Sequence, residues 1–285
     1  MTVERSKNAD EENFPVGSQL IAAPLRKHVA AFYDFARTAD DIADSPDLPS
    51  SKKLQKLNGL EEVLRGRESA SRESASPETL CAAKLRLSLL ECNVTIDHAR
   101  DLLKAFRMDA SGKKYETFED LTGYCRYSAA AVGRFMLDLH KESPSAYFSS
   151  DALCAALQIN NHLQDCKKDY LTLNRVYLPQ VWFDEQGLTA DALNADRTNE
   201  KLRAVFDRAV SAIEGLLTES APIPMVIRSR GLRMEVCVIY KLAQRLAARL
   251  KTQDILAQNV SLRKSDWFIA GLAGVFAGLR RKKLT

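Results

Sequence analysis

Two acidic motifs contain the residues of this chain that are best placed to bind a cation. The first motif holds Asp40 and Asp44, and the second, in a distant part of the sequence, holds Asp165 and Asp169. In each motif the two aspartates are four residues apart, so on an α-helix both carboxylates would lie on one face. Carboxylates stacked in this way repel each other, and their oxygens suit a hard cation such as Mg²⁺. A cation held there would attract an anionic substrate, for which a diphosphate is the natural candidate.

The residues around the motifs extend this pattern. Gln158 and Asn161 precede Asp165 and Asp169 at helical spacing, which predicts an oxygen-bearing stripe over three turns. Arg37 lies one turn before the first motif, where it could neutralise a carboxylate or bind a phosphate oxygen. The alternative is a solvated helix face with salt bridges. The apolar and aromatic residues around the first motif favour the metal site.

Between the motifs, Tyr124 precedes a run of small residues at 128–131. Small residues allow a backbone or a ligand to approach closely, and nearby aromatic rings could face a hydrocarbon or stabilise a cation. A tightly packed helix crossing is the alternative interpretation. Arg126, Arg134 and Arg175 are candidate phosphate partners, with surface salt bridges as their alternative.

Other kinds of chemistry have weaker support. His162 and Cys166 are four residues apart and could suggest a zinc site or a nucleophile pair, but no second pair of ligands occurs at metal spacing. We expect both side chains to pack or to support the site. The chain has no GxGxxG motif after a strand, no GxxxxGK[ST] and no GxSxG. Nicotinamide binding, nucleotide triphosphate hydrolysis and this type of serine hydrolysis therefore lack support.

The body of the chain is neutral, although 41 basic and 37 acidic residues give a formal net charge of +4. The excess comes from Arg280, Arg281, Lys282 and Lys283, so nucleic-acid binding has no electrostatic support elsewhere. A hydrophobic content of 46% is ordinary for a globular protein. The six cysteines are scattered without a CxxC pair, which is typical of reduced thiols. The charged N-terminal segment does not predict a signal peptide. We expect a cytoplasmic protein that does not bind nucleic acid.

Apolar residues recur at helical spacing through most of the chain, and no run alternates apolar and polar residues long enough to indicate a strand. The pattern predicts an all-α fold of about ten helices in a single domain over residues 1–285. We expect three segments outside the helices, namely a flexible N-terminus (1–12), an exposed loop (66–78) and a basic tail (280–285). Pro77 suits the start of the helix that follows the loop.

No segment reaches the ~18–20 apolar residues that a membrane-spanning helix needs. The nearest is 267–279, whose large apolar residues precede the basic tail. This segment suits a final core helix, or a helix that lies on an anionic membrane surface. Because Gly271, Gly274 and Gly278 lower helix propensity and leave little room for an apolar face, we expect a packed helix. Its membrane contact would be weak and peripheral, at the inner face.

These residues occur in the same order as the motifs of a known family. The shared positions are Phe14, the helix with Tyr33, Arg37, Asp40 and Asp44, the segment 124–133, and the run containing Gln158, Asn161, Asp165 and Asp169. They resemble the squalene/phytoene synthase family over about 13–264. The resemblance implies an isoprenoid-synthase-type helical bundle with a central active-site cavity. It also implies Mg²⁺, held by the two acidic motifs, and the head-to-head joining of two prenyl diphosphates.

Two departures from the family pattern point to a subgroup. Gln164 stands where the family usually has Arg, and Ser128-Ala129-Ala130 replaces the usual Val-Ala-Gly. With these departures the chain resembles the bacterial hydroxysqualene synthases, which ionise presqualene diphosphate, rearrange the cation and quench it with water. That resemblance implies a link to a presqualene diphosphate synthase and to a squalene-forming reductase in hopanoid biosynthesis. Gln164 could orient the water, or it could be structural.

The resemblance also implies roles for individual residues. The implied metal ligands are Asp40, Asp44, Asn161, Asp165 and Asp169. The implied catalytic residues are Tyr33, Arg37, Tyr124 and Gln164, and the implied substrate-binding residues are Phe14, Phe32, Arg37, Arg126, Gln158 and Arg175. Two alternatives stay open: condensation of two prenyl diphosphates to presqualene diphosphate, squalene or phytoene, and a non-catalytic helical assembly factor. The intact aspartate pairs count against the assembly factor.

Overall fold

The computed structural model describes residues 19–67 and 76–279, and every regular element within them is a helix. The predicted all-α fold is therefore confirmed. Phe14, the N-terminal segment 1–12, the tail 280–285 and most of the loop 66–78 lie outside the described residues. The end of that loop behaves as predicted, because α3 begins at Pro77 and the side chain of Ser76 accepts a hydrogen bond from the Thr79 N–H.

The described residues form thirteen α-helices and two short 3₁₀-helices, more than the ten or so expected. The extra elements are the short α9 and α11 and the products of two breaks, at Ser128 and Asp165. In chain order the elements are α1 (Ala23–Asp44), α2 (Ser50–Arg65), α3 (Pro77–Cys92), α4 (Asp97–Ala110), α5 (Phe118–Tyr127), α6 (Ala129–Leu139), η2 (Pro144–Ala146), α7 (Tyr147–Gln164), α8 (Cys166–Leu173), α9 (Gln180–Asp184), η3 (Ala190–Asn194), α10 (Glu200–Ser220), α11 (Ile223–Val226), α12 (Arg230–Thr252) and α13 (Lys264–Leu279).

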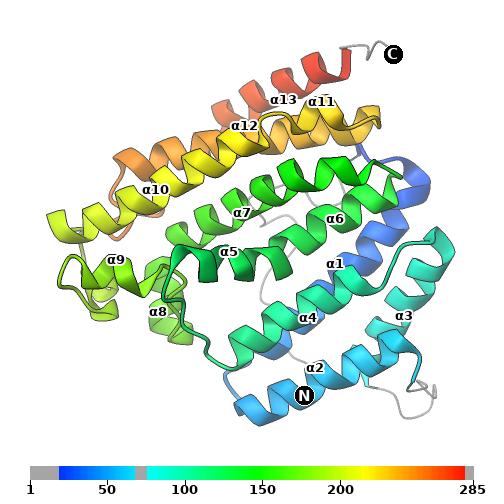
Figure 1. Ribbon diagram of the computed structural model, residues 1–285, viewed down its shortest axis with the longest axis horizontal. Helices are drawn as coiled ribbons and strands as arrows, with labels where there is room; N and C mark the ends of the chain where they lie inside the picture. The colour runs from blue at the N-terminus through cyan, green and yellow to red at the C-terminus, as the bar shows by residue number, and fades with distance from the viewer. Residues whose placement is uncertain (1–18, 68–75, 280–285) are drawn as a thin grey trace.

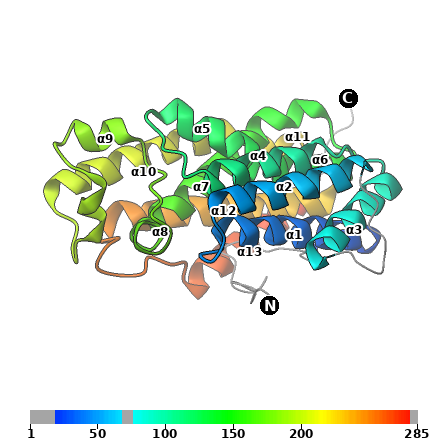
Figure 2. The same cartoon turned by 90° about the horizontal axis from the view of Figure 1, so that it is seen from below.

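The helices bury their apolar faces in two clusters. One cluster joins α1, α2, α3 and α4 to one face of α6, and the other joins α5, α7, α9, α10 and α12. In Figures 1 and 2, α8 and α9 lie at one end of the elongated array and α3 lies at the other. Helices α1 and α6 of the first cluster and α7 and α12 of the second line a cavity where the two clusters meet. These four helices position the site described below.

The C-terminal helix α13 packs antiparallel to α12 at the outer edge of the array (Figures 1 and 2). Its inner face is made of small residues, including Gly274 and Gly278. A Cβ on Gly274 would lie 2.7 Å from the Val238 Cγ2 atom and 3.1 Å from the Met234 carbonyl oxygen, so glycine favours the close approach of the two helices there. Arg249 of α12 fixes the start of α13 through an ion pair with the buried Asp266, at 2.7 Å.

Because the glycines face inward, the large apolar side chains of α13 point outward. They are Trp267, Phe268, Ile269, Leu272, Val275, Phe276 and Leu279, and all are exposed. The expectation that the glycines leave little room for an apolar face is therefore wrong. The small residues recur every four positions and form the packing face, which leaves the opposite face to the large residues.

Candidate active site

The two acidic motifs line one polar cavity of about 320 Å³. The lining residues on the motifs and beside them are Arg37, Asp40, Asp44, Gln158, Asn161, Asp165, Asp169 and Arg175. The structure thus brings together all five predicted metal ligands and three of the predicted substrate-binding residues. Helix α1 carries one side of the cavity, and α7 and α8 carry the other.

Helix α1 presents Arg37, Asp40 and Asp44 on one face because they are three and four residues apart. The Arg37 guanidinium donates to the Asp40 carboxylate at 2.8 Å and lies 3.5 Å from the Asp41 carboxylate. All three side chains are less than one-third exposed, so this is a partly buried charge cluster at the cavity wall. This partial burial argues against the alternative of a solvated helix face with salt bridges.

The second motif spans a break between two helices. The expected stripe over three continuous turns is interrupted at Asp165, where α7 ends and α8 begins. Helical hydrogen bonds continue on both sides, since the Asp165 N–H donates to the Asn161 carbonyl and the Asp169 N–H donates to the Asp165 carbonyl, each at 2.8 Å. The bend therefore keeps the three oxygen-bearing side chains on the cavity wall.

Two of the four carboxylates in the motifs, those of Asp40 and Asp169, have raised pKa values. Burial and the neighbouring Asp44 raise the pKa of Asp40 to about 7, although Arg37 opposes the rise. Burial and the neighbouring Asp165 and Asp44 raise the pKa of Asp169 to about 7. Crowded acids of this kind are characteristic of functional sites. A bound divalent cation would supply positive charge there.

The donor set fits Mg²⁺, because the motifs offer carboxylate and amide oxygens. No three His, Cys, Asp or Glu side chains among residues 19–67 and 76–279 are grouped closely enough to form a ready-made metal cluster. The fit therefore rests on the chemistry of the donors and on the raised pKa values of Asp40 and Asp169. These residues would hold the ion at the polar cavity.

Arg175 joins the two sides of this cavity. Asn174 ends α8 in the left-handed conformation, with φ of 50°, which turns the chain back toward α1. The Arg175 guanidinium then pairs with the Asp44 carboxylate and donates to the Ala43 carbonyl at 3.0 Å. This contact places a largely buried cation where a phosphate oxygen would bind.

A buried acid that the sequence analysis missed lies at the same cavity. Asp109, at the end of α4, accepts hydrogen bonds from the Tyr124 hydroxyl at 2.9 Å and the Tyr177 hydroxyl at 3.0 Å. Burial raises its pKa to about 6. His162 stacks on Tyr177 with ring centroids 3.6 Å apart, and burial lowers its pKa to about 3. This neutral, stacked histidine agrees with the packing role expected for it.

An apolar cavity of about 360 Å³ lies beside the polar one. Its walls come mainly from α1, α6, α7 and α12, and they include Phe32 and Tyr33. The Phe32 ring stacks on Phe135 with centroids 3.9 Å apart, which fixes α1 against α6. The two cavities share the lining residues Ala36, Ala129, Val132 and Gln158.

The small residues of α6 allow its close contact with α7. A Cβ on Gly133 would lie 2.6 Å from the Cys154 sulfur and 2.8 Å from the Ser150 hydroxyl, so a larger residue would push the helices apart. The break at Ser128 separates α5 from α6 and leaves Tyr124 and Ser128 on the wall of the polar cavity. The segment 124–133 thus contributes both to a close helix crossing and to the cavity walls.

Several predicted site residues do not join this group. Arg126 is exposed on α5 and lines neither cavity, because its position on the helix points it away from them. The Gln164 amide donates to the Val260 carbonyl and also lines neither cavity. Arg134 pairs with Asp151 instead of facing the polar cavity. The geometry therefore favours a structural role for Gln164 and Arg134.

Comparison with known proteins gives a consistent result. The squalene/phytoene synthase family model matches residues 7–266. A hydroxysqualene synthase of Rhodopseudomonas palustris is 42% identical over 97% of this chain and 92% of its own length. The hydroxysqualene synthase of Zymomonas mobilis is 41% identical over 96% of this chain and 90% of its own length. The hydroxysqualene synthase of Sinorhizobium fredii is 38% identical over 93% of this chain and 88% of its own length.

Solved structures share this architecture. A squalene synthase from Alicyclobacillus acidocaldarius has a TM-score of 0.69 at 28% identity, covering 82% of this chain and 85% of that one. A dehydrosqualene synthase with a bound ligand has the same fold, with a TM-score of 0.69 at 22% identity over 94% of this chain and 90% of that one. The resemblance to the family is thus confirmed over nearly the whole sequence. The chain belongs to the squalene/phytoene synthase family of enzymes, and it is 38–42% identical to three hydroxysqualene synthases.

Proposed function

We propose that this enzyme releases diphosphate from presqualene diphosphate and adds water to the resulting cation, which gives hydroxysqualene. One observation carries the proposal: an acidic, oxygen-rich cavity shares part of its wall with an apolar cavity of about 360 Å³. The first suits a metal-bound diphosphate, and the second suits a branched hydrocarbon. The identity of 38–42% to three proteins named hydroxysqualene synthase supports this choice of substrate.

The first step breaks the bond between the substrate carbon and the diphosphate oxygen, and the electron pair leaves with the diphosphate. Arg37 and Arg175 line the polar cavity, where they neutralise charge that develops on the leaving group. Mg²⁺, when bound, supplies Lewis-acid stabilisation of that group. The residues that would hold it are Asp40, Asp44, Asn161, Asp165 and Asp169.

The cation that remains rearranges within apolar surroundings. Phe32 and Tyr33 line that cavity, and the face of an aromatic ring attracts a cation. Tyr124 lies at the polar cavity instead, where its hydroxyl is held by Asp109. The apolar walls keep bulk water from the cation until the rearrangement is complete. Gln158 lines both cavities, so its amide lies where diphosphate and hydrocarbon meet.

We place the reaction between two others. The substrate joins two prenyl units through a cyclopropane ring, so a condensing enzyme must supply it. The product is an allylic alcohol, and replacement of its hydroxyl group by hydrogen, which gives a hydrocarbon, requires a reductase. The proposed partners are therefore a presqualene diphosphate synthase and a squalene-forming reductase, as the resemblance to the subgroup implies.

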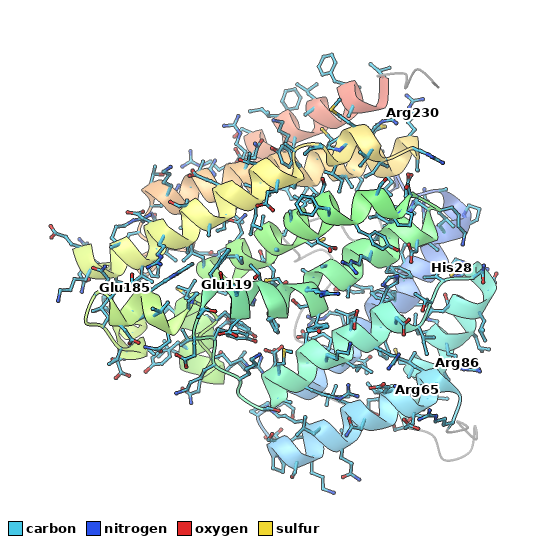
Figure 3. The ribbon with its side chains drawn as sticks, viewed as in Figure 1. His28, Arg65, Arg86, Glu119, Glu185 and Arg230 are labelled. Carbon is cyan, nitrogen blue, oxygen red and sulfur yellow. The ribbon has the colours of Figure 1, made fainter. Side chains whose placement is uncertain are left out.

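We also propose that α13 rests on the inner face of the membrane. Among the described residues, no helix is long and apolar enough to span a bilayer. The outer face of α13 nevertheless exposes Phe268 and Phe276 by 69% and 67%. Exposed basic residues lie near both ends of this helix, because Lys264 is its first residue and Arg230 of α12 lies near its C-terminal end (Figure 3). An apolar helix face with basic ends suits an anionic lipid surface.

The decisive test supplies purified protein with either presqualene diphosphate or farnesyl diphosphate, in the presence of Mg²⁺. We expect release of diphosphate from the first substrate alone, without a nicotinamide cofactor, and an alcohol that contains ¹⁸O when the reaction runs in labelled water. Formation of presqualene diphosphate or phytoene from prenyl diphosphates would instead assign the chain to the condensing members of the family. Absence of turnover with all of these substrates would support the assembly-factor alternative.

A further inference from the structure

A buried carboxyl group on α12 faces the apolar cavity. Glu235 is only 4% exposed and lines this cavity together with Leu232, Val236 and Ile239 of the same helix. Among the described residues that line the cavity, it is the only one with an acidic or basic side chain. The position follows from helical spacing, because Glu235 is three residues after Leu232 and four before Ile239.

The Glu235 carboxyl has no hydrogen-bond partner for its buried Oε2 atom among the residues that the structure describes. Glu142, also buried, shows how this fold satisfies a structural carboxylate: it accepts hydrogen bonds from the N–H groups of Arg228 at 2.8 Å and Ser229 at 2.6 Å. Burying a carboxyl without a partner opposes folding. The unpartnered Oε2 atom therefore opposes folding, so stability does not explain why a carboxyl group lies at this position.

The proposed reaction needs a group with these properties. Addition of water to a carbocation releases one proton, which has to be accepted inside an apolar cavity. Ser150 and Gln158 also line the cavity, but a hydroxyl and an amide are not bases near neutral pH. Burial raises the pKa of Cys154 to about 12, so its thiolate does not form there. Burial raises the pKa of Glu235 to about 7, which suits a general base.

We propose that Glu235 is the catalytic base that orients the attacking water and accepts its proton. In this step the water oxygen forms a bond to the cationic carbon, one O–H bond breaks, and the proton moves to the Glu235 carboxylate. No oxidant or reductant takes part. The inference rests on the proposed function, since it concerns the water step of that reaction. It assigns the ionisation step to the polar cavity and the water step to α12.

The test compares Glu235→Gln with Glu142→Gln, which changes a buried carboxylate outside both cavities. Each variant receives presqualene diphosphate and Mg²⁺ in ¹⁸O-labelled water, and diphosphate release is measured in parallel with product analysis by mass spectrometry. In Glu235→Gln we expect the fraction of labelled alcohol to fall at least about tenfold, while diphosphate release falls less. Hydrocarbons formed by loss of a proton should replace the alcohol. Glu235→Asp should restore part of the alcohol.

The control Glu142→Gln should lower the melting temperature and leave the product unchanged. An unaltered alcohol fraction in folded Glu235→Gln would overturn the proposal, as would equal losses of diphosphate release and of alcohol, since the residue would then act before water addition. Glu235→Leu provides a second variant with an apolar side chain, for which we expect the same change of product. If the wild-type protein does not consume presqualene diphosphate, the proposed function fails, and the role of Glu235 fails with it.

Discussion

The guanidinium of Arg175 binds the carboxylate of Asp44, although the two residues are 131 positions apart in sequence. This ion pair joins the end of α1 to the turn after α8, and both residues line the polar cavity. A diphosphate and its metal ions would enter beside this contact. The pair therefore links the helix that carries the first acidic motif to the segment that follows the second.

Replacement of Arg175 by Gln should lower kcat/KM by on the order of 10²-fold, because the leaving group loses a positioned cation and Asp44 loses its partner. Diphosphate release from presqualene diphosphate provides the measurement. Arg126→Gln is the matched control. Arg126 is exposed and lines neither cavity, so its replacement should change kcat/KM by less than about twofold. A larger loss of kcat/KM in Arg126→Gln than in Arg175→Gln would contradict the role of Arg175 in binding the leaving group.

Replacement of Asp40 or Asp165 by Asn or Ala should lower turnover by at least about 10²-fold and leave the helical circular dichroism spectrum unchanged. The reason is that each variant removes one carboxylate from the proposed Mg²⁺ site. EDTA should abolish the activity of the wild-type protein, and Mg²⁺ should restore it. Asp207→Asn, on the exposed side of α10, is the control and should retain full turnover. Full activity in either site variant would exclude the metal assignment.

Gln164→Ala should leave the product unchanged and reduce stability by about 1 kcal/mol. The Gln164 amide donates to the Val260 carbonyl, and the side chain lines neither cavity, so the loss concerns packing of the end of α7. Thermal unfolding and product analysis together provide the check. A change from alcohol to other products in this variant would instead support the water-orienting role implied by the family resemblance.

The variant Glu235→Gln should have a higher free energy of unfolding than the wild-type protein at pH 8, but not at pH 4. Burial raises the pKa of Glu235 to about 7, so between about pH 4.5 and 7 the folded state keeps a proton that the unfolded state has lost. The wild-type free energy of unfolding therefore falls as the pH rises through this window. At ~1.4 kcal/mol per pKa unit, the variant should gain up to ~3 kcal/mol at pH 8. Denaturant unfolding at both pH values tests this, and equal differences at pH 4 and 8 would contradict it.

The variant Phe268→Gln/Phe276→Gln should sediment with anionic liposomes less than the wild-type protein does. Both rings are exposed on α13, and burial of apolar side chains in the lipid interface drives this binding. Leu87→Gln is the control, because Leu87 is 65% exposed on α3, which packs on α1 and α2. Removal of residues 280–285 should weaken binding at low salt and leave turnover in detergent nearly unchanged. If all variants bound liposomes as well as the wild-type protein does, the proposed membrane contact of α13 would be contradicted.

Much of the fold and one part of the site could be predicted from local spacing. The i,i+4 aspartates of each motif lie on one helix face, so the sequence indicated a shared site for Asp40, Asp44, Asp165 and Asp169. The break at Asp165 could not be predicted in the same way. Apolar spacing continues through that residue, and the hydrogen bonds on both sides remain helical.

Contacts between segments that are distant in sequence leave no comparable pattern in the local spacing of residues. Asp109 has no acidic residue within four positions of it in sequence, and only the fold brings the hydroxyls of Tyr124 and Tyr177 to it. Glu235 is likewise a single acid in an apolar stretch, where its spacing from Leu232 and Ile239 could have revealed its buried position. Which cavity it faces depends on how α12 packs against α1, α6 and α7. The surroundings of Asp109 and Glu235 are therefore set by tertiary packing, which the local spacing of residues does not reveal.

The apolar cavity separates the two hydrophobic clusters of the protein. Phe32 and Phe135 belong to one cluster, whereas Leu153 and Leu232 belong to the other, and all four line the cavity. A hydrocarbon chain in this space would touch both clusters and replace the contacts that an empty cavity lacks. The substrate would thus serve as part of the hydrophobic core during the reaction. Its departure as product would remove those contacts, so unfolding should be most cooperative while the cavity is filled.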